Sequence, residues 1–139
     1  RRMCIRDRID IPVRGIDGAL TGNGRALLVE VADGLARFAA GGEPCVIDLS
    51  GLPLTEADRD WLRRELGEGE VSVRLAAGGE SIIHETAYSG VWWVEHRNAH
   101  GLRVSEFIEI TRVPELLLAH PDDVILGSER LNRRILELD

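Results

Sequence analysis

The chain has 139 residues, of which 17 are basic and 24 are acidic, and its formal net charge is −7. This length suits one domain, with enough chain to bury a core without disulfides or a structural metal. With 44% hydrophobic residues the composition is that of a globular protein, and its acidic balance argues against general nucleic-acid binding, because a negative surface repels the phosphate backbone.

The first residues differ in charge from the rest of the chain. Residues 1–14 contain five arginines and two aspartates, and we expect residues 1–21 to form a lead-in or linker before a single domain at residues 22–139. The sequence begins without methionine, which favours a domain taken from a longer protein. It contains neither an apolar run long enough to span a membrane nor a signal-peptide pattern, so we expect a cytoplasmic protein.

Periodicity predicts a helix, a strand and a second helix in the first half of the domain. Apolar residues recur at helical spacing over residues 25–40, and a short apolar run at residues 45–49 is typical of a strand. Thr55 and Asp58 have the spacing of a capping box, with Asp in place of the usual Glu or Gln. They predict that a helix begins here and continues to about Leu66.

The spacing of apolar residues then changes from helical to alternating, which predicts an antiparallel meander. Glycine-containing turns and a hairpin loop separate four strand segments at residues 71–75, 81–86, 91–97 and 102–111. The last two segments flank the four-residue loop 98–101, which is typical of a hairpin. In the final segment Glu106 breaks the alternation, because it occupies a position that otherwise carries apolar residues.

Two further helices are predicted after the strands. Pro114 suits the first position of a short helix through Leu118, with His120 at its C-terminal end and Pro121 closing it. A last helix is expected from about Ser128. Together the elements predict an α+β fold, in which an antiparallel meander of about four strands has its helices packed mainly on one face.

Residues capable of catalysis or metal binding are scattered along the chain. His96 and His100 lie four positions apart but span a hairpin end, and His84 lies on a neighbouring strand segment. Solvent-facing histidines are the default interpretation; a small metal-binding or metal-transfer protein, or an enzyme, that uses these three histidines is the alternative. Two cysteines without a CxxC unit cannot alone hold an iron–sulfur cluster or a structural zinc ion. We therefore expect no catalytic residues, no metal and no cofactor.

An aromatic cluster is more informative. Tyr88, Trp92 and Trp93 are three of the six aromatic residues. On a strand, two adjacent tryptophans point to opposite faces of the sheet. If helices cover one face only, the other indole needs a different cover, which could be a terminal segment, a second subunit or a client protein. Tryptophan is common at binding hot spots, so the cluster is a candidate partner surface. Two structural tryptophans, both covered within the chain, are the alternative.

Three stretches carry a resemblance to a known family: LPLTEAD at residues 52–58, LGEGEV at residues 66–71 and ETAYSGVW at residues 85–92. In this order and spacing they resemble the C-terminal conserved region of the HupH/HyaF hydrogenase expression proteins, over about residues 25–120. The resemblance implies an accessory protein for the assembly of NiFe uptake hydrogenases. Its implied partners are the iron–sulfur small subunit before export and other maturation factors. It supplies no catalytic residues.

The resemblance and the aromatic cluster together lead to the hypothesis of a noncatalytic chaperone or scaffold that binds the small subunit. The acidic loop at residues 68–70 would complement a basic segment, such as a twin-arginine export signal. A structural dimerisation module, with the second tryptophan in a symmetric interface, is a further alternative. The hypothesis assigns partner binding to Tyr88, Trp92, Trp93, Glu68, Glu70 and Glu85.

Overall fold

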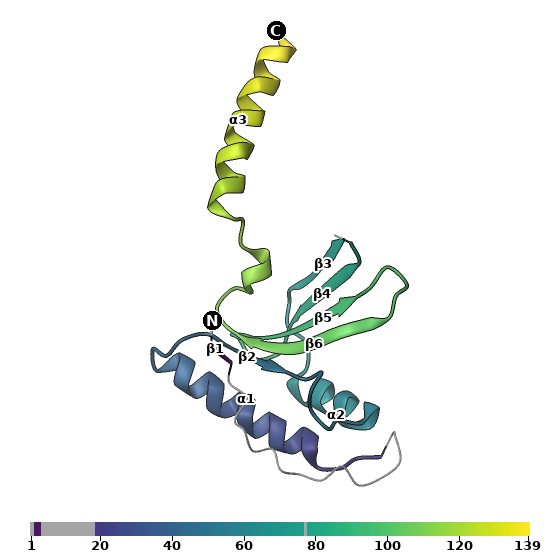
Figure 1. The fold of residues 1–139 in the computed structure, drawn as a ribbon. Coiled ribbons are helices and arrows are strands. Elements are labelled where there is room, and N and C mark those ends of the chain that lie inside the picture. Colours follow the sequence, from purple (N-terminus) through teal and green to yellow (C-terminus); the bar gives the residue numbers. More distant parts are fainter. Residues whose placement is uncertain (1, 4–18, 77) are drawn as a thin grey trace.

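The computed structural model describes residues 2–3, 19–76 and 78–139, so most of the expected lead-in lies outside the described residues. One sheet has two helices on one side, and a third helix stands away from it (Figure 1). The helices are α1 (Asn23–Ala39), α2 (Glu56–Leu66) and α3 (Pro121–Leu138), and a 3-10 turn, η1 (Glu115–Leu117), precedes α3. The strands are β1 (Arg2–Met3), β2 (Cys45–Asp48), β3 (Ser72–Ala76), β4 (Glu80–Glu85), β5 (Val91–Arg97) and β6 (Arg103–Ile110).

The strands lie in the order β1-β2-β6-β5-β4-β3. β3, β4, β5 and β6 are consecutive antiparallel neighbours, which confirms the predicted meander and the α+β class. The strand predicted at residues 45–49 joins the same sheet, because β2 pairs antiparallel with β6. The two-residue β1 pairs parallel with β2. The sheet is therefore larger than the meander alone.

The sheet separates two clusters of buried apolar side chains, one on each face. Strand alternation directs Val91 and Trp93 of β5 toward α1 and α2, where they join the main core. Trp92 and Val94 point to the other face and form a smaller cluster, against which Leu117 of η1 packs. The predicted opposite orientation of the two tryptophans is confirmed. The cover over Trp92 includes a segment of the same chain.

Side-chain contacts fix where α1 and α2 begin. The Thr55 hydroxyl accepts a hydrogen bond from the Asp58 N–H at 3.0 Å, and the Asp58 carboxylate accepts one from the Thr55 N–H at 3.2 Å. This is the predicted capping box. α1 begins two residues earlier than its periodicity indicates, at Asn23, whose side-chain amide donates to the Pro53 carbonyl at 2.6 Å. That contact depends on a loop 30 positions away.

The C-terminal helices differ from the prediction. The short helix is the 3-10 turn η1, and Pro114 is its N-cap rather than its first residue. His120 does not end that helix: it is the N-cap of α3, and its Nδ1 accepts from the Asp122 N–H at 3.1 Å. Pro121 opens α3, so this helix starts about two turns before Ser128. The prediction was wrong because proline suits the first turn of a helix as well as the end of the preceding one.

No helix in the described part of the chain combines the length and the apolar character needed to cross a membrane.

Candidate partner-binding groove beside Tyr88

The three histidines considered for metal binding do not converge. His84 faces the helices from β4, and its Nδ1 lies 3.1 Å from the Ser72 hydroxyl. His96 lies on the other face of the sheet, 2.6 Å from the Ser81 hydroxyl, and His100 is an exposed residue of the β5–β6 turn. Among the described residues, no group of three or more His, Cys, Asp or Glu side chains is placed to hold a metal ion.

Both tryptophans assigned to partner binding are buried. The exposed fraction is 6% for Trp92 and 2% for Trp93. The Trp92 indole N–H donates to the Thr111 carbonyl at 3.1 Å, and that of Trp93 donates to the Glu106 carboxylate at 3.0 Å. The expectation that one of these indoles forms an exposed surface does not hold; the alternative of two structural tryptophans fits. Of this cluster, Tyr88 is the surface residue, at 51% exposed.

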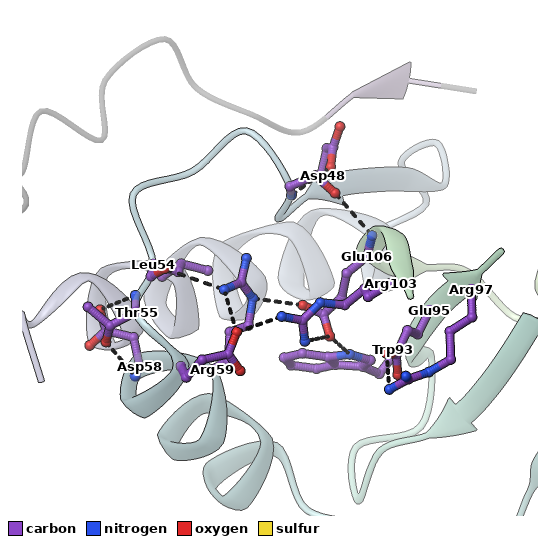
Figure 2. Close-up of polar contacts among 12 residues, drawn as sticks. Asp48, Leu54, Thr55, Asp58, Arg59, Trp93, Glu95, Arg97, Arg103 and Glu106 are labelled. Atoms are coloured by element: carbon purple, nitrogen blue, oxygen red, sulfur yellow. Dashed lines mark hydrogen bonds and ion pairs between the residues drawn. The ribbon is translucent and has the colours of Figure 1, made fainter. Parts of the chain in front are cut away.

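A buried carboxylate explains the break in the alternation of β6. Glu106 is 2% exposed and faces α2 (Figure 2). Its Oε1 accepts a hydrogen bond from Arg59 Nε at 2.9 Å, and its Oε2 accepts the one from Trp93. Arg103 lies 3.8 Å from Oε2 and donates to the exposed Glu56 at 2.6 Å. A buried charge is tolerated when it is paired and hydrogen-bonded. Glu106 therefore ties β5 and β6 to α2.

Asp58 performs a similar task between the start of α1 and α2. Its carboxylate accepts from the Thr21 N–H at 2.9 Å and from the Thr21 hydroxyl at 2.6 Å, in addition to the capping bond from Thr55. Burial opposes ionisation of this carboxyl, but these hydrogen bonds outweigh burial and lower the pKa of Asp58. The two helices are thereby fixed relative to each other.

The LGEGEV and ETAYSGVW stretches lie side by side. The Gly69 N–H donates to the Glu85 carbonyl at 2.8 Å, and the Ala87 N–H donates to the Leu66 carbonyl at 2.9 Å. The Glu85 carboxylate accepts from the Glu70 N–H at 3.1 Å. Glu85 is half-buried and holds the loop after α2, so its position favours a structural role over the partner contact predicted for it.

Two glycines allow this close approach. Gly67 ends α2 with a φ of 67°, a conformation that favours glycine. A Cβ on Gly69 would overlap the Glu85 side chain and the Thr86 carbonyl oxygen. The loop can therefore pass β4 at this distance only without a side chain at position 69.

Tyr88 borders an apolar groove between α1, α2 and the start of β5, with a volume of about 250 Å³. This volume is just below the roughly 300 Å³ at the small end of small-molecule pockets, and it suits one or two apolar side chains of a protein partner. We refer to it as the Tyr88 groove. Its lining residues are Leu28, Val31, Ala32, Leu35, Glu65, Leu66, Tyr88 and Val91.

Three carboxylates lie in or next to the Tyr88 groove. Glu65 is one of its lining residues, and the exposed Glu68 and Glu70 lie on the loop that continues from α2. Glu68 shares a small adjacent pocket with Arg63 and Trp93, where the Arg63 guanidinium lies 5.3 Å from the indole centroid. An apolar hollow beside an acidic loop has the chemistry to receive an apolar segment that carries basic residues.

Some of the residues predicted to bind a partner lie close together in the structure, and residues that were not predicted lie beside them. Tyr88 lies at the groove, and the exposed Glu68 and Glu70 lie on the loop that follows α2. The contributions of α1 and of Glu65 were missed. The α1 side chains follow the same helical spacing as its core residues, so periodicity alone could not separate groove positions such as Leu28 from buried ones.

The chain is similar to known proteins over most of its length. The model of the HupH hydrogenase expression protein, C-terminal conserved region, matches residues 21–138. The chain is 34% identical to the hydrogenase expression/formation protein HoxQ of Azotobacter vinelandii, over 83% of this chain and 41% of the relative. It is 36% identical to the hydrogenase-1 operon protein HyaF of Escherichia coli, over 65% of this chain and 32% of the relative. The chain thus spans about two fifths or less of these relatives.

A solved structure extends the likeness to the fold. The hydrogenase expression protein HupH from Thiobacillus denitrificans superposes with a TM-score of 0.82 and 47% sequence identity, covering 86% of this chain and 99% of that one. The three stretches that suggested the resemblance all lie within the region matched by the family model. The chain therefore belongs to the HupH hydrogenase expression protein family and corresponds to its C-terminal conserved region.

Proposed function

We propose that this chain is a noncatalytic accessory protein for the assembly of a NiFe uptake hydrogenase. In this role it holds a peptide segment of the iron–sulfur small subunit in the Tyr88 groove before export, and it therefore acts in the cytoplasm. Membership of the hydrogenase expression family supports a role in maturation. The observation that carries the peptide-binding part is the apolar groove beside an acidic loop, to which two of the family stretches contribute Leu66, Tyr88 and Val91.

The chemistry of the groove favours a particular kind of peptide. Tyr88 offers a half-exposed ring that can cover an apolar side chain, and Leu28 and Leu35 supply further apolar surface from α1. Glu65 and Glu68 can attract arginines that precede such a side chain. A twin-arginine export signal combines basic and apolar residues in this way. Binding should therefore weaken as salt is raised, because the exposed carboxylates are screened.

The test is capture of the small-subunit precursor by the purified chain. Tyr88→Ala should weaken capture at least about tenfold, as expected for an aromatic hot-spot residue. Val104→Ala is the matched control, because Val104 is also exposed but lies at the opposite end of the β5–β6 pair. Circular dichroism and a thermal melt should show that both variants remain folded.

Further measurements test separately whether the groove is the binding site and whether the small subunit is the client. Glu65→Gln combined with Glu68→Gln should weaken capture and reduce its dependence on salt, since two exposed carboxylates are neutralised. Equal capture by wild type and a folded Tyr88→Ala variant would contradict the groove as the binding site. A wild-type chain that captures no small-subunit precursor would contradict the proposed client.

A further inference from the structure

Helix α3 presents an apolar face that no other described element covers. It projects away from the sheet with the C-terminus at its tip (Figure 1), and all of its residues are exposed. Helices of this length are stabilised mainly by packing of an apolar face rather than by propensity. Its exposed apolar side chains are Val124, Ile125, Leu126, Leu131, Ile135, Leu136 and Leu138.

Six of these seven side chains fall on one side of the helix. A helix with 3.6 residues per turn places Ile125 and Leu136 in a row beside a heptad-spaced seam, and it places Leu126 on the opposite face. The stripe is wider than a seam alone, so a single row of contacts would leave part of it exposed. The seam consists of Val124, Ser128, Leu131, Ile135 and Leu138.

The charges of α3 are divided along its length. Asp123 lies in the first turn and Arg134 about three turns later, and both flank the seam on the side away from Ile125. The first half of α3 carries acids and no base, whereas the next turn and a half carries bases and no acid. The acids of the first half are Asp122, Asp123 and Glu129, and the bases that follow are Arg130, Arg133 and Arg134. Glu137 in the last turn is a further acid, and it lies 3.3 Å from the Arg134 guanidinium of its own helix.

We propose that α3 pairs with the α3 helix of a second copy of this chain, in an antiparallel arrangement about a two-fold axis. The axis passes between Ser128 and Leu131, so that Leu131 packs against Ser128 of the second copy. In the same register Val124 packs against Ile135 of the second copy. Each contact occurs twice, as in any isologous dimer.

The antiparallel register also gives the side chains on both flanks of the seam complementary partners. On one flank Ile125 meets Leu136 of the second copy, which accounts for the width of the apolar stripe. On the other flank Asp123 meets Arg134 of the second copy, so the acidic half of each helix faces the basic segment of its partner. A parallel pair would place like charges together. The charge pattern and the apolar pattern thus select the same arrangement, and that self-complementarity identifies a second copy as the partner.

The buried area indicates the strength of the pair. Six apolar side chains at roughly 100 Å² each give about 600 Å² per copy. This is below the roughly 800 Å² per partner of a standard stable interface, so we expect a reversible dimer that depends on concentration. The inference goes beyond the proposed function and is independent of it, because α3 contributes none of the residues that line the Tyr88 groove.

Sedimentation equilibrium of the 139-residue chain tests the pairing. The wild type should approach twice the chain mass of 15.4 kDa as its concentration rises. Leu131→Glu should weaken dimerisation at least about tenfold, because it places a charge in each of the two central layers. Leu126→Glu should leave dimerisation unchanged. It is a matched control, since it makes the same change on the same helix at a comparable exposed fraction, 53% against 64%.

A charge reversal tests the orientation. Asp123→Arg should weaken the dimer, because it would face Arg134 of the second copy, and adding Arg134→Asp in the same chain should restore it. A chain that stays monomeric up to about 0.5 mM would overturn the proposal. So would a dimer that tolerates Leu131→Glu, or a double variant that dimerises no better than Asp123→Arg alone.

Discussion

Removal of the buried Glu106 carboxylate should lower the free energy of unfolding far more than removal of an exposed carboxylate would. In Glu106→Ala, the Arg59 guanidinium and the Trp93 indole N–H both lose an acceptor, at 2.9 and 3.0 Å. Loss of one partner of a buried ion pair costs about 3–5 kcal/mol. Arg59 also lies 3.4 Å from both the Leu54 carbonyl and the Glu56 carboxylate, which can compensate in part. We therefore expect the lower end, about 3 kcal/mol.

Urea unfolding followed by tryptophan fluorescence measures this loss, and in a thermal melt it corresponds to a decrease in Tm of about 10 °C. Glu56→Ala is the matched control, because Glu56 bonds to two of the same arginines but is 61% exposed. Exposed ion pairs contribute little, so this variant should lose no more than about 0.5 kcal/mol. Glu106→Gln, which keeps the shape and one acceptor oxygen, should fall between the two.

Similar losses of stability in Glu106→Ala and Glu56→Ala would refute this reasoning. They would mean that the buried ion pair stabilises the fold no more than the exposed one does. They would also mean that leaving the Arg59 guanidinium without Glu106 does not lower the free energy of unfolding. A Glu106→Ala variant within about 1 kcal/mol of wild type would lead to the same conclusion.

Three further predictions concern single side chains. Gly69→Ala should lower the free energy of unfolding by about 1–3 kcal/mol in a urea titration, because a Cβ would collide with Glu85 and the Thr86 carbonyl. Asp58→Asn should be less stable than wild type at neutral pH. Because folding lowers the pKa of Asp58 below its ordinary 3.8, this difference should be complete above about pH 4 and disappear as the pH falls through the lowered pKa, in urea titrations at successive pH values. Trp92→Phe should lose about 1 kcal/mol with its hydrogen bond, but it should capture the small-subunit precursor as wild type does, since the side chain is buried.

The sequence allows prediction of those parts of the fold that depend on neighbouring residues. Thr55 and Asp58 are three positions apart, and the cap they form needs nothing else to start α2. The meander follows from alternation and from turns of a few residues between consecutive strands. The opposite directions of Trp92 and Trp93 follow from strand geometry alone.

Features set by distant contacts could not be predicted. α1 begins where the Asn23 side chain reaches Pro53, and its position against α2 depends on hydrogen bonds between Thr21 and Asp58. The Tyr88 groove exists because these contacts place α1 beside the β4–β5 turn. Glu106 occupies an inward position of β6 by alternation, but only its distant partners Arg59 and Trp93 explain why a carboxylate is accepted there.

The family stretches mainly provide the framework of the groove. Asp58 caps α2 and holds the segment before α1, and Gly69 lets the following loop pass β4. The Thr86 hydroxyl donates to the Val91 carbonyl at 2.9 Å and so braces the turn that presents Tyr88. Substitutions at these framework positions should abolish client binding by disturbing the fold, and they cannot identify the binding surface. The exposed residues Tyr88 and Glu65 can be changed without removing a framework contact, so they are the positions at which binding and folding can be separated.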